Sequence, residues 1–271
     1  MDNQKNVLTL PMAIVVAGII IGGAVFFSRG GTRTEIFKQP EQPAAASISG
    51  DISLRAVSGV DHITGNPDAN IVMVEYSDLE CPFCKSFHKT MLSLMDDYGK
   101  NGKLAWVYRH FPLDIHPRSP KESEASECAF ELAGNNGFWS FVDKVFEITP
   151  ANNGLDSVQL PVIAGQVGLD VAKFNTCLDS GKYAAKIKAD YDDGLKAGVN
   201  GTPHTVLIMN SPLTPAAEKS LTDINANIMQ QMQPGSPSLI KIDPSKTKVG
   251  ISGAFQPQMM KQIIDLILAG K

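Results

Sequence analysis

The chain has 271 residues and a mass of 29.1 kDa, which is enough for a domain with a sizeable hydrophobic core. Its 24 basic and 28 acidic residues give a formal net charge of -4 and an isoelectric point of about 5.7. Because no overall cationic field draws the chain to nucleic acid, a nucleic-acid-binding function is not expected.

An uncharged apolar segment covers residues 8–27. As a helix it is about 30 Å long, which matches the hydrocarbon core of a bilayer. We therefore predict a single transmembrane anchor over 8–27. Flanking charges do not orient it, and residues 1–7 are expected to be a short cytoplasmic N-terminus only because disulfide chemistry requires the domain to lie outside the reducing cytosol. The alternative is a cleaved secretory signal. Such a signal usually has a shorter apolar part that ends close to a small-residue cleavage site, whereas the Ala-rich stretch 44–46 lies well downstream.

Residues 28–58 are rich in Gly, Gln, Pro, Ala and Ser and show no apolar periodicity. This composition is typical of a flexible linker. The first strong element follows at residues 71–77, where a nearly continuous β-branched apolar run predicts a buried strand. A helix is predicted directly after the Cys81-Pro82-Phe83-Cys84 motif, and a second strand is predicted over 104–111.

The later part of the chain alternates between a helical block and short strands. Residues 112–199 are predicted to be mostly helical, and a helix over 215–232 is expected to pack its apolar face on its own domain. The sequence therefore predicts an α/β or α+β sheet that is covered by helices, with a helical block between its two sheet-like regions. The individual helices are predicted over 119–134, 137–147, 156–166, 170–178, 182–197 and 257–269, and the strands over 205–209, 239–242 and 249–252.

The motif of Cys81 and Cys84 has a specific chemical use at the start of a helix. Both sulfurs can close a small disulfide, and the first lies where unpaired N–H groups and the helix dipole stabilise a thiolate. Cys81 is then the nucleophile and Cys84 the resolving thiol. Zinc is the competing interpretation, because His88 extends the motif, but no second paired cluster supplies the remaining ligands. We therefore favour redox chemistry, predict no metal, and expect His88 to lie on the helix surface.

The segment EYSDLECPFC at 75–84 resembles the active-site segment of DsbA-like thiol:disulfide oxidoreductases. The resemblance covers about residues 60–271 and implies a thioredoxin-like fold over 59–271, with the helical insertion at about 112–199. Four later segments resemble landmarks of the same family in the same order: YRHFPL (108–113), GFW (137–139), CLDSG (177–181) and VNGTP (199–203).

The resemblance also implies roles for particular residues. Thr202-Pro203 matches the loop whose proline is cis and faces the two cysteines, where a substrate backbone can dock. Glu75 matches a buried acid beneath the disulfide that can relay protons to or from Cys84, although it could also be an ordinary outward-facing strand residue. The substrate-binding surface is expected to comprise Pro82, Phe83, Thr202, Pro203 and His204.

Two residues depart from the family pattern. Phe83 replaces the histidine of the most oxidising members, which removes a cation beside the thiolate. His204 stands where threonine is common, and it either restores a cation or is only a strand residue. We predict an oxidant weaker than the strongest of the family.

Cys128 and Cys177 both lie in the helical block. An oxidising compartment would preserve a disulfide between them, and two separate buried thiols are the alternative.

These features predict a membrane-tethered enzyme that introduces disulfides into reduced exported proteins, with its catalytic domain outside the cytoplasm. Reoxidation by a membrane quinone-linked protein is implied by the resemblance alone. No cofactor is expected, since the sequence has neither a phosphate-binding loop nor a dinucleotide-binding glycine run. A reductase of the cell envelope and a non-catalytic, membrane-anchored binding module or chaperone are the alternatives. An isomerase is disfavoured, because residues 28–58 are too short and polar for a dimerisation domain.

Overall fold

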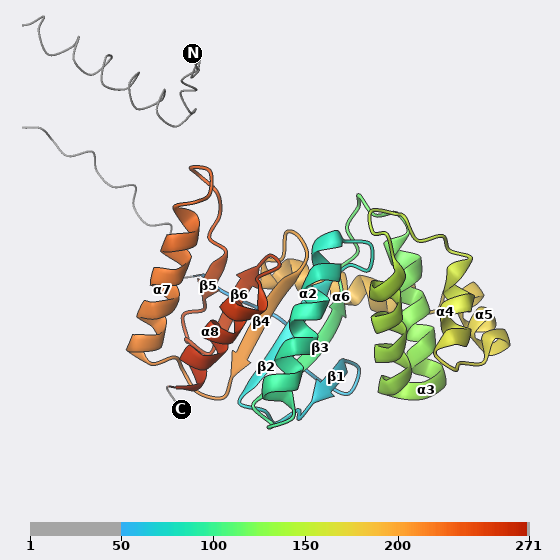
Figure 1. Cartoon of the computed structure of the whole chain (residues 1–271), viewed down its shortest axis with the longest axis horizontal. Helices are drawn as coiled ribbons and strands as arrows, with labels where there is room; N and C mark the ends of the chain where they lie inside the picture. Colours follow the sequence, from blue (N-terminus) through green and yellow to red (C-terminus); the bar gives the residue numbers. More distant parts are fainter. Residues whose placement is uncertain (1–49, 270–271) are drawn as a thin grey trace, which may run out of the picture. The chain divides into compact units, whose positions relative to one another are not determined.

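The computed structural model describes residues 50–269, which form a six-stranded sheet with helices on both of its faces (Figure 1). The strands lie in the order β1-β3-β2-β4-β6-β5. Their bounds are β1 (His62–Gly65), β2 (Ile71–Ser77), β3 (Leu104–His110), β4 (His204–Met209), β5 (Ile240–Ile242) and β6 (Lys248–Ser252). The predicted strands are confirmed, and β1 was not predicted.

The centre of the sheet is the predicted strand–helix–strand unit. β2 pairs in parallel with β3, and α2 (Pro82–Leu94) connects them, followed by a π-helical turn, η1 (Met95–Gly99). On its other side β2 pairs antiparallel with β4, so that Tyr76 lies opposite His204. This pairing brings the end of β2 and the start of β4 together, although they are far apart in the chain.

The side chains of β2 alternate between two hydrophobic clusters. Ile71 and Met73 pack in the larger cluster with α2 and α8 (Pro257–Leu268), whereas Val74 and Tyr76 pack on the opposite face with residues of α6 (Ala184–Ala197). Glu75 alternates along β2 in step with Ile71 and Met73, so its side chain lies on the same face of the sheet as theirs. The pleat therefore points this carboxylate toward α2, the helix that follows the cysteine motif.

The predicted helical insertion lies between β3 and β4 and comprises α3 (Ser119–Ile148), α4 (Gln159–Gln166), α5 (Val171–Ser180) and α6. α3 contains the first two predicted helices, which are separated by a kink where Ala133 and Gly134 have non-helical backbone and the φ of Gly134 is +62°. The predicted end of the first helix at Gly134 is thus confirmed. Beyond the insertion, α7 (Pro215–Met229) buries Leu221 against its own domain, as predicted, while Met232 lies past the end of the helix and is exposed.

Residues 28–58 were predicted to be a flexible linker, and the structure describes residues 50–58 of this segment, which differ from that prediction. Ile52 is buried in the cluster on the α6 face, and the backbone N–H of Gly50 donates to the carbonyl of Ile242. Arg55 bonds to Asp61 and Asp190 through its guanidinium group. Residues 50–58 therefore pack on the domain, which begins no later than Gly50. Ile52 and Arg55 are the residues in this polar stretch that indicate packing on the domain, and the average composition of residues 28–58 does not reveal them.

The predicted cytoplasmic N-terminus at 1–7, the predicted anchor at 8–27 and the linker up to residue 49 lie outside the described residues. Within residues 50–269, every helix is too short or insufficiently apolar to cross a membrane.

Candidate functional site: a dithiol at the start of a helix

Cys81 and Cys84 lie at the junction between β2 and α2. The chain turns after Ser77, the backbone N–H of Cys81 donates to the carbonyl of Asp78 (3.1 Å), and Cys81 is the N-cap of α2. Pro82 occupies the first helical turn, where its missing N–H removes no helical bond. Both cysteines are free thiols in this structure. The local sequence thus places one sulfur at the helix end and the other within its first turn.

The environment of Cys81 stabilises its thiolate. The thiol of Cys84 donates to the Cys81 sulfur, the backbone N–H groups of Cys84 and Phe83 also point at it, and together these hydrogen bonds outweigh burial and lower the pKa of Cys81 to about 6. The side chain has only 3% of its surface exposed. As a thiol, it donates to the carbonyl oxygen of Thr202 over 3.4 Å.

Cys84 has the opposite character. It is fully buried, and burial raises its pKa well above the usual range, with the neighbouring Cys81 adding to the rise. The backbone N–H of Asp78 approaches its sulfur at 3.5 Å. One thiol of the pair is therefore readily ionised and the other is held protonated. This asymmetry suits a dithiol in which Cys81 reacts first.

Glu75 lies inside the domain on the α2 face, so its outward-facing alternative does not apply. Its side chain is 0% exposed, and its Oε2 accepts a hydrogen bond from the indole Nε1 of Trp106 (2.9 Å). Burial raises the pKa of Glu75 to about 7. The carboxyl group can therefore gain or lose a proton near neutral pH. Sequence reasoning did not identify Trp106, which fixes this carboxylate from the neighbouring strand.

The Thr202–Pro203 peptide bond is cis, as the family resemblance implied. The carbonyl of Pro203 accepts from the backbone N–H of Gly253 (2.9 Å), which fixes the loop beside β6. Pro82 and Phe83 project from the start of α2 into solvent, Phe83 with 65% of its surface exposed. The structure therefore brings the predicted residues Cys81, Pro82, Phe83, Thr202 and Pro203 together at one end of the sheet.

His204 lies within the domain, and this answers the question that the sequence left open. Its side chain is 4% exposed and its Nδ1 lies 3.1 Å from the hydroxyl of Ser252. Burial lowers the pKa of His204 to about 4, so the ring is neutral at physiological pH. It does not restore the cation lost at Phe83, and its buried side chain is not part of an exposed substrate-binding surface.

His88 was predicted to lie on the helix surface, and this prediction is wrong. The residue is 3% exposed, and its ring packs against Trp106 and Phe146. Its Nε2 lies 2.7 Å from the Oδ1 of Asp143 on α3. The periodicity of the sequence predicted the helix α2 itself, but it does not show that α3 of the insertion packs against the side of α2 that carries His88. His88 is thus engaged by a carboxylate rather than by the two cysteines.

A loop of the helical insertion is bonded to the residue that precedes Cys81. The buried carboxylate of Glu80 accepts from the backbone N–H groups of Gly154 (3.1 Å) and Leu155 (3.2 Å), and its carbonyl accepts from Asn152 N–H (2.7 Å). Ala151, Asn152 and Asn153 in this loop all have positive φ. These contacts join the insertion to the cysteine turn, and no local sequence signal indicated them.

One buried group of side chains has the composition of a metal site. His62, His110 and Glu127 place ligand atoms within 4.8 Å of one another. However, Lys186 Nζ contacts the same Glu127 oxygen at 2.9 Å, and the Nδ1 atoms of both histidines have no hydrogen-bond partner among the described residues. A metal on Nε2 would require buried, unpaired N–H groups at both Nδ1 atoms, whereas metal-bound histidines normally donate there. The donor set therefore fits hydrogen bonds to Glu127 better than a metal ion.

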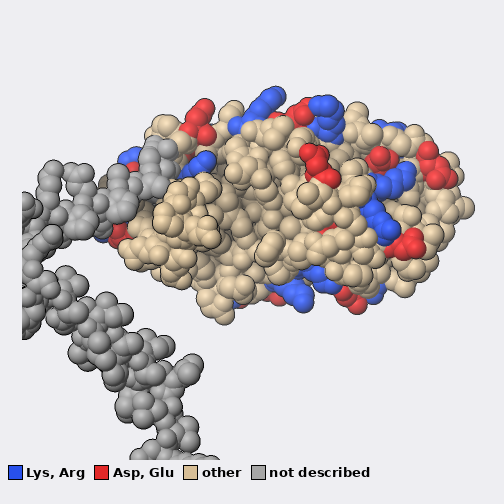
Figure 2. Space-filling model, turned by 90° about the horizontal axis from the view of Figure 1, so that it is seen from above, with Lys and Arg blue, Asp and Glu red and all other residues tan. Residues whose placement is uncertain are grey.

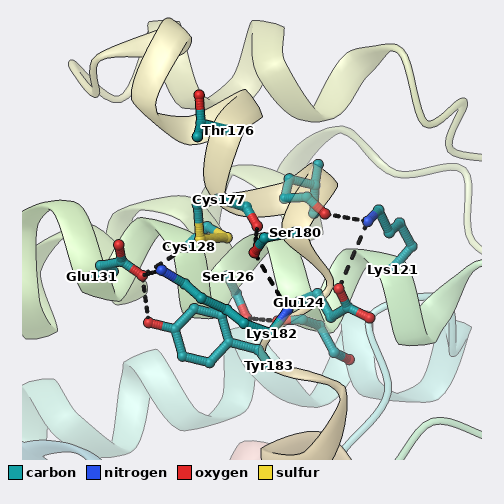
Figure 3. The surroundings of a disulfide bond; sticks show 12 residues. Lys121, Glu124, Ser126, Cys128, Glu131, Thr176, Cys177, Ser180, Lys182 and Tyr183 are labelled. Carbon is teal, nitrogen blue, oxygen red and sulfur yellow. Dashed lines mark hydrogen bonds and ion pairs between the residues drawn. A yellow bond between two sulfur atoms is a disulfide. The ribbon is translucent and has the colours of Figure 1, made fainter.

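Cys128 and Cys177 form a disulfide that joins α3 to α5, and the predicted pairing is confirmed. The bond links residues 49 positions apart, with their Cα atoms separated by 5.8 Å. Nearby, Glu131 accepts a hydrogen bond from the hydroxyl of Tyr183 (2.7 Å) and pairs with Lys182 (Figure 3). These contacts hold the insertion together at a distance from the redox motif.

The N-terminal end of α2 lies at the upper side of Figure 1, and Figure 2 shows that side from above. Lysine, arginine and acidic side chains gather mostly toward the edges of this face, and much of its middle is uncharged.

A family model described as thioredoxin matches residues 58–224, which is more than half of the chain. The chain belongs to the thioredoxin family. Among solved structures, a single-residue variant of alpha-DsbA1 from Wolbachia pipientis is 25% identical with a TM-score of 0.58, covering 79% of this chain and 93% of that protein. DsbA2 of Pseudomonas aeruginosa is 24% identical with a TM-score of 0.53, covering 78% and 96%. The DsbA-like fold supports thiol–disulfide exchange by this thioredoxin-family protein.

Curated relatives include sodium/proton antiporters. The antiporter NhaA of Herminiimonas arsenicoxydans is 33% identical over 144 residues, which are 53% of this chain but 22% of the antiporter. NhaA 1 of Mycolicibacterium gilvum is 29% identical over 195 residues, covering 71% of this chain and 29% of that protein. The chain thus spans less than a third of these relatives, and ion transport is not transferred to it.

Proposed function

We propose that this protein is a thiol–disulfide oxidase that introduces disulfide bonds into exported proteins. The observation that carries the proposal is the asymmetry of its dithiol, in which the pKa of Cys81 is lowered to about 6 and that of Cys84 is raised. A stabilised thiolate favours the reduced enzyme, so the oxidised enzyme passes its disulfide to substrates. Each pKa unit of such stabilisation corresponds to about 1.4 kcal/mol, or about 30 mV in a two-electron couple.

In the proposed mechanism, a substrate thiolate attacks Cys81 of the Cys81–Cys84 disulfide. A mixed disulfide forms between the substrate and Cys81, and Cys84 leaves as a thiolate that takes up a proton. A second substrate thiolate then attacks the substrate sulfur of the mixed disulfide. The substrate leaves with a new disulfide, and Cys81 leaves as the stabilised thiolate. The enzyme has gained the two electrons that the substrate lost.

Glu75 supplies and removes the proton of Cys84 in this scheme. Its pKa of about 7 suits both directions, and the electrostatic effect of Glu75 on Cys84 supports this role. The substrate backbone docks along Thr202 and Pro203, while the exposed rings of Pro82 and Phe83 contact its apolar side chains. This division of roles gives Cys81 the chemistry and the cis-proline loop the positioning.

We infer that the domain works outside the cytoplasm, anchored by residues 8–27. An oxidising compartment would maintain both the Cys128–Cys177 bond and an oxidised active site. Reoxidation of the Cys81–Cys84 dithiol then requires an electron acceptor. A quinone-linked membrane protein is the partner class that the DsbA resemblance suggests.

The proposal is tested by following disulfide formation in a reduced, unfolded secreted protein. The wild-type protein should accelerate disulfide formation in a glutathione redox buffer, and the Cys81→Ser variant should not. The double variant Cys128→Ser/Cys177→Ser is the matched control, because it removes two sulfurs outside the site and should retain the acceleration. Equal activity of the wild type and Cys81→Ser would refute the oxidase and favour a binding module.

A further inference from the structure

The buried position of Glu75 raises the question of how its proton reaches solvent. Its side chain is 0% exposed, its Oε2 is occupied by Trp106, and its Oε1 has no hydrogen-bond partner among the described residues. An acid that gives and takes a proton in every cycle must exchange that proton with water. Trp106 cannot carry it, because an indole N–H is only a donor.

His88 offers a suitable acceptor inside the domain. It lies one helical turn after Cys84 on α2, and its Nε2 is bonded to the Oδ1 of Asp143 at 2.7 Å. A carboxylate accepts, so the Nε2 atom carries the proton in the neutral ring, and Nδ1 is left with a free lone pair. That Nδ1 atom is buried and has no partner in the part of the chain that the structure describes.

Glu75 and His88 are brought together around one indole ring. Trp106 donates to Glu75 through Nε1, and its ring centroid lies 5.3 Å from that of His88. Burial raises the pKa of Glu75, and His88, when it is protonated, acts on the pKa of this carboxyl in the opposite direction. At the outer end, the side chain of Asp143 is 47% exposed. A buried imidazole thus lies between a buried carboxyl group and one that reaches solvent.

We propose that His88 and Asp143 form the path by which Glu75 exchanges its proton with solvent. The inference rests on the proposed thiol–disulfide exchange, and it assigns to His88 a positioning and relay role that acts through Glu75. The two unpartnered atoms, Glu75 Oε1 and His88 Nδ1, are the ones that the path joins, directly or through a bridging water.

The proton balance of the path follows the reoxidation step. When Cys84 attacks a mixed disulfide on Cys81, its proton passes to the Glu75 carboxylate, the new Cys81–Cys84 bond forms, and the former partner leaves as a thiolate. The Glu75 acid then transfers the proton to His88 Nδ1, which gives an imidazolium beside the Asp143 carboxylate. Loss of the Nε2 proton toward Asp143 and water returns a neutral ring, and rotation or tautomerisation restores Nε2–H.

The charged and titratable groups around this path are few. Glu75 faces Cys81, Cys84 and His88 from α2 and Tyr108 from β3, whose pKa is raised well above the usual range by burial. His88 faces Asp143 from α3. The Tyr108 phenol therefore stays protonated and does not compete as a proton acceptor near neutral pH.

The test measures the second step of oxidation by oxidised glutathione, in which Cys84 resolves the Cys81–glutathione mixed disulfide. Quenched samples analysed by mass spectrometry give its rate. His88→Gln keeps a neutral group that can donate to Asp143 but removes the proton acceptor, and we expect the rate to fall by about tenfold. Glu75→Gln should also slow the step. The double variant should be no slower than Glu75→Gln, because both residues belong to one path.

His62→Gln is the matched control, since His62 is a buried histidine with an equal 2.7 Å contact to a carboxylate, Glu127, and neither residue belongs to the proposed path. In His62→Gln, the rate at which Cys84 resolves the mixed disulfide should equal that of the wild type. The equilibrium redox potential of His88→Gln should also equal that of the wild type. An unchanged rate in His88→Gln, an additive loss in the double variant, or a shifted potential would overturn the relay. Absence of any mixed disulfide in the wild type would instead refute the proposed function.

Discussion

The sulfur of Cys81 lies 3.4 Å from the carbonyl oxygen of Thr202, although 121 positions separate the two residues in the chain. The pairing of β2 with β4 produces this contact, because Tyr76 lies opposite His204 and the two loops continue from these residues. The cysteine turn and the cis-proline loop are therefore brought together by the sheet, before any substrate binds.

The Cys84→Ser variant should accumulate mixed disulfides with peptides that contain a disulfide. The Cys81 thiolate can still attack such a peptide, but no resolving thiol remains to release it. Mass spectrometry without reductant should detect the covalent adduct, which disappears on reduction. Adducts formed equally well by Cys81→Ser would contradict the assignment of Cys81 as the nucleophile.

Alkylation of Cys81 by iodoacetamide should depend on pH with a midpoint near 6, because its pKa is lowered to about that value. An ordinary cysteine has its midpoint near about 8.5. The hydrogen bond from the Cys84 thiol is the largest cause of the lowering. Cys84→Ala should therefore raise the midpoint, whereas Cys84→Ser, whose hydroxyl can still donate, should raise it less. Equal midpoints in the two variants would contradict this cause.

Glu75→Gln should change how the stability of the reduced protein depends on pH. Burial raises the pKa of Glu75 from 4.5 to about 7, so its contribution to stability is full below about pH 4.5 and is lost as the pH rises through 7. Relative to the wild type, the variant should therefore gain roughly 3 kcal/mol of unfolding free energy between pH 4 and pH 8. Urea unfolding of both reduced proteins at the two pH values measures it.

A difference between the two proteins that stays constant from pH 4 to pH 8 would show that Glu75 ionises as it does in water. Trp106→Phe offers a second check on the same carboxyl. It removes the indole donor to Oε2, which stabilises the charged form, and should raise the pKa of Glu75 further.

Phe83→His and His204→Gln should have unequal effects on the active site. Residue 83 is exposed beside the thiolate, so a histidine there adds a cation in acid solution and lowers the pKa of Cys81. One unit corresponds to about 30 mV in the redox potential. His204 is buried and neutral, since its pKa is about 4, so His204→Gln should leave the pKa of Cys81 unchanged. An equal shift in both variants would contradict the neutral state of His204.

The sequence predicted those parts of the site that depend on local pattern. The apolar run of β2, the cysteine motif at the start of α2 and the order of the later segments identified the fold and the two cysteines. The predictions that were wrong concern residues whose environment depends on contacts between distant segments. His88 was expected in solvent because the periodicity of α2 does not reveal that α3 covers it.

The same limit applies to the loop at Glu80 and to the segment before β1. The burial of Glu80 is compensated by the backbone N–H groups of residues 154 and 155, which donate to its carboxylate. The sequence around the cysteine motif does not reveal these donors. Arg55 lies in a polar stretch, and of its two partners Asp61 is six residues away whereas Asp190 is 135 residues away in the chain. Such ion pairs follow from the folded topology and not from local composition.

The equilibrium redox potential of the Cys81–Cys84 pair, measured against glutathione, tests the oxidase most directly. With its stabilised thiolate but without a cation at residue 83 or 204, the pair should have a potential between about -200 mV and the roughly -120 mV of DsbA. A potential near that of thioredoxin, about -270 mV, would make the protein a reductase and contradict the account. A value at or above about -120 mV would contradict the predicted weaker oxidant.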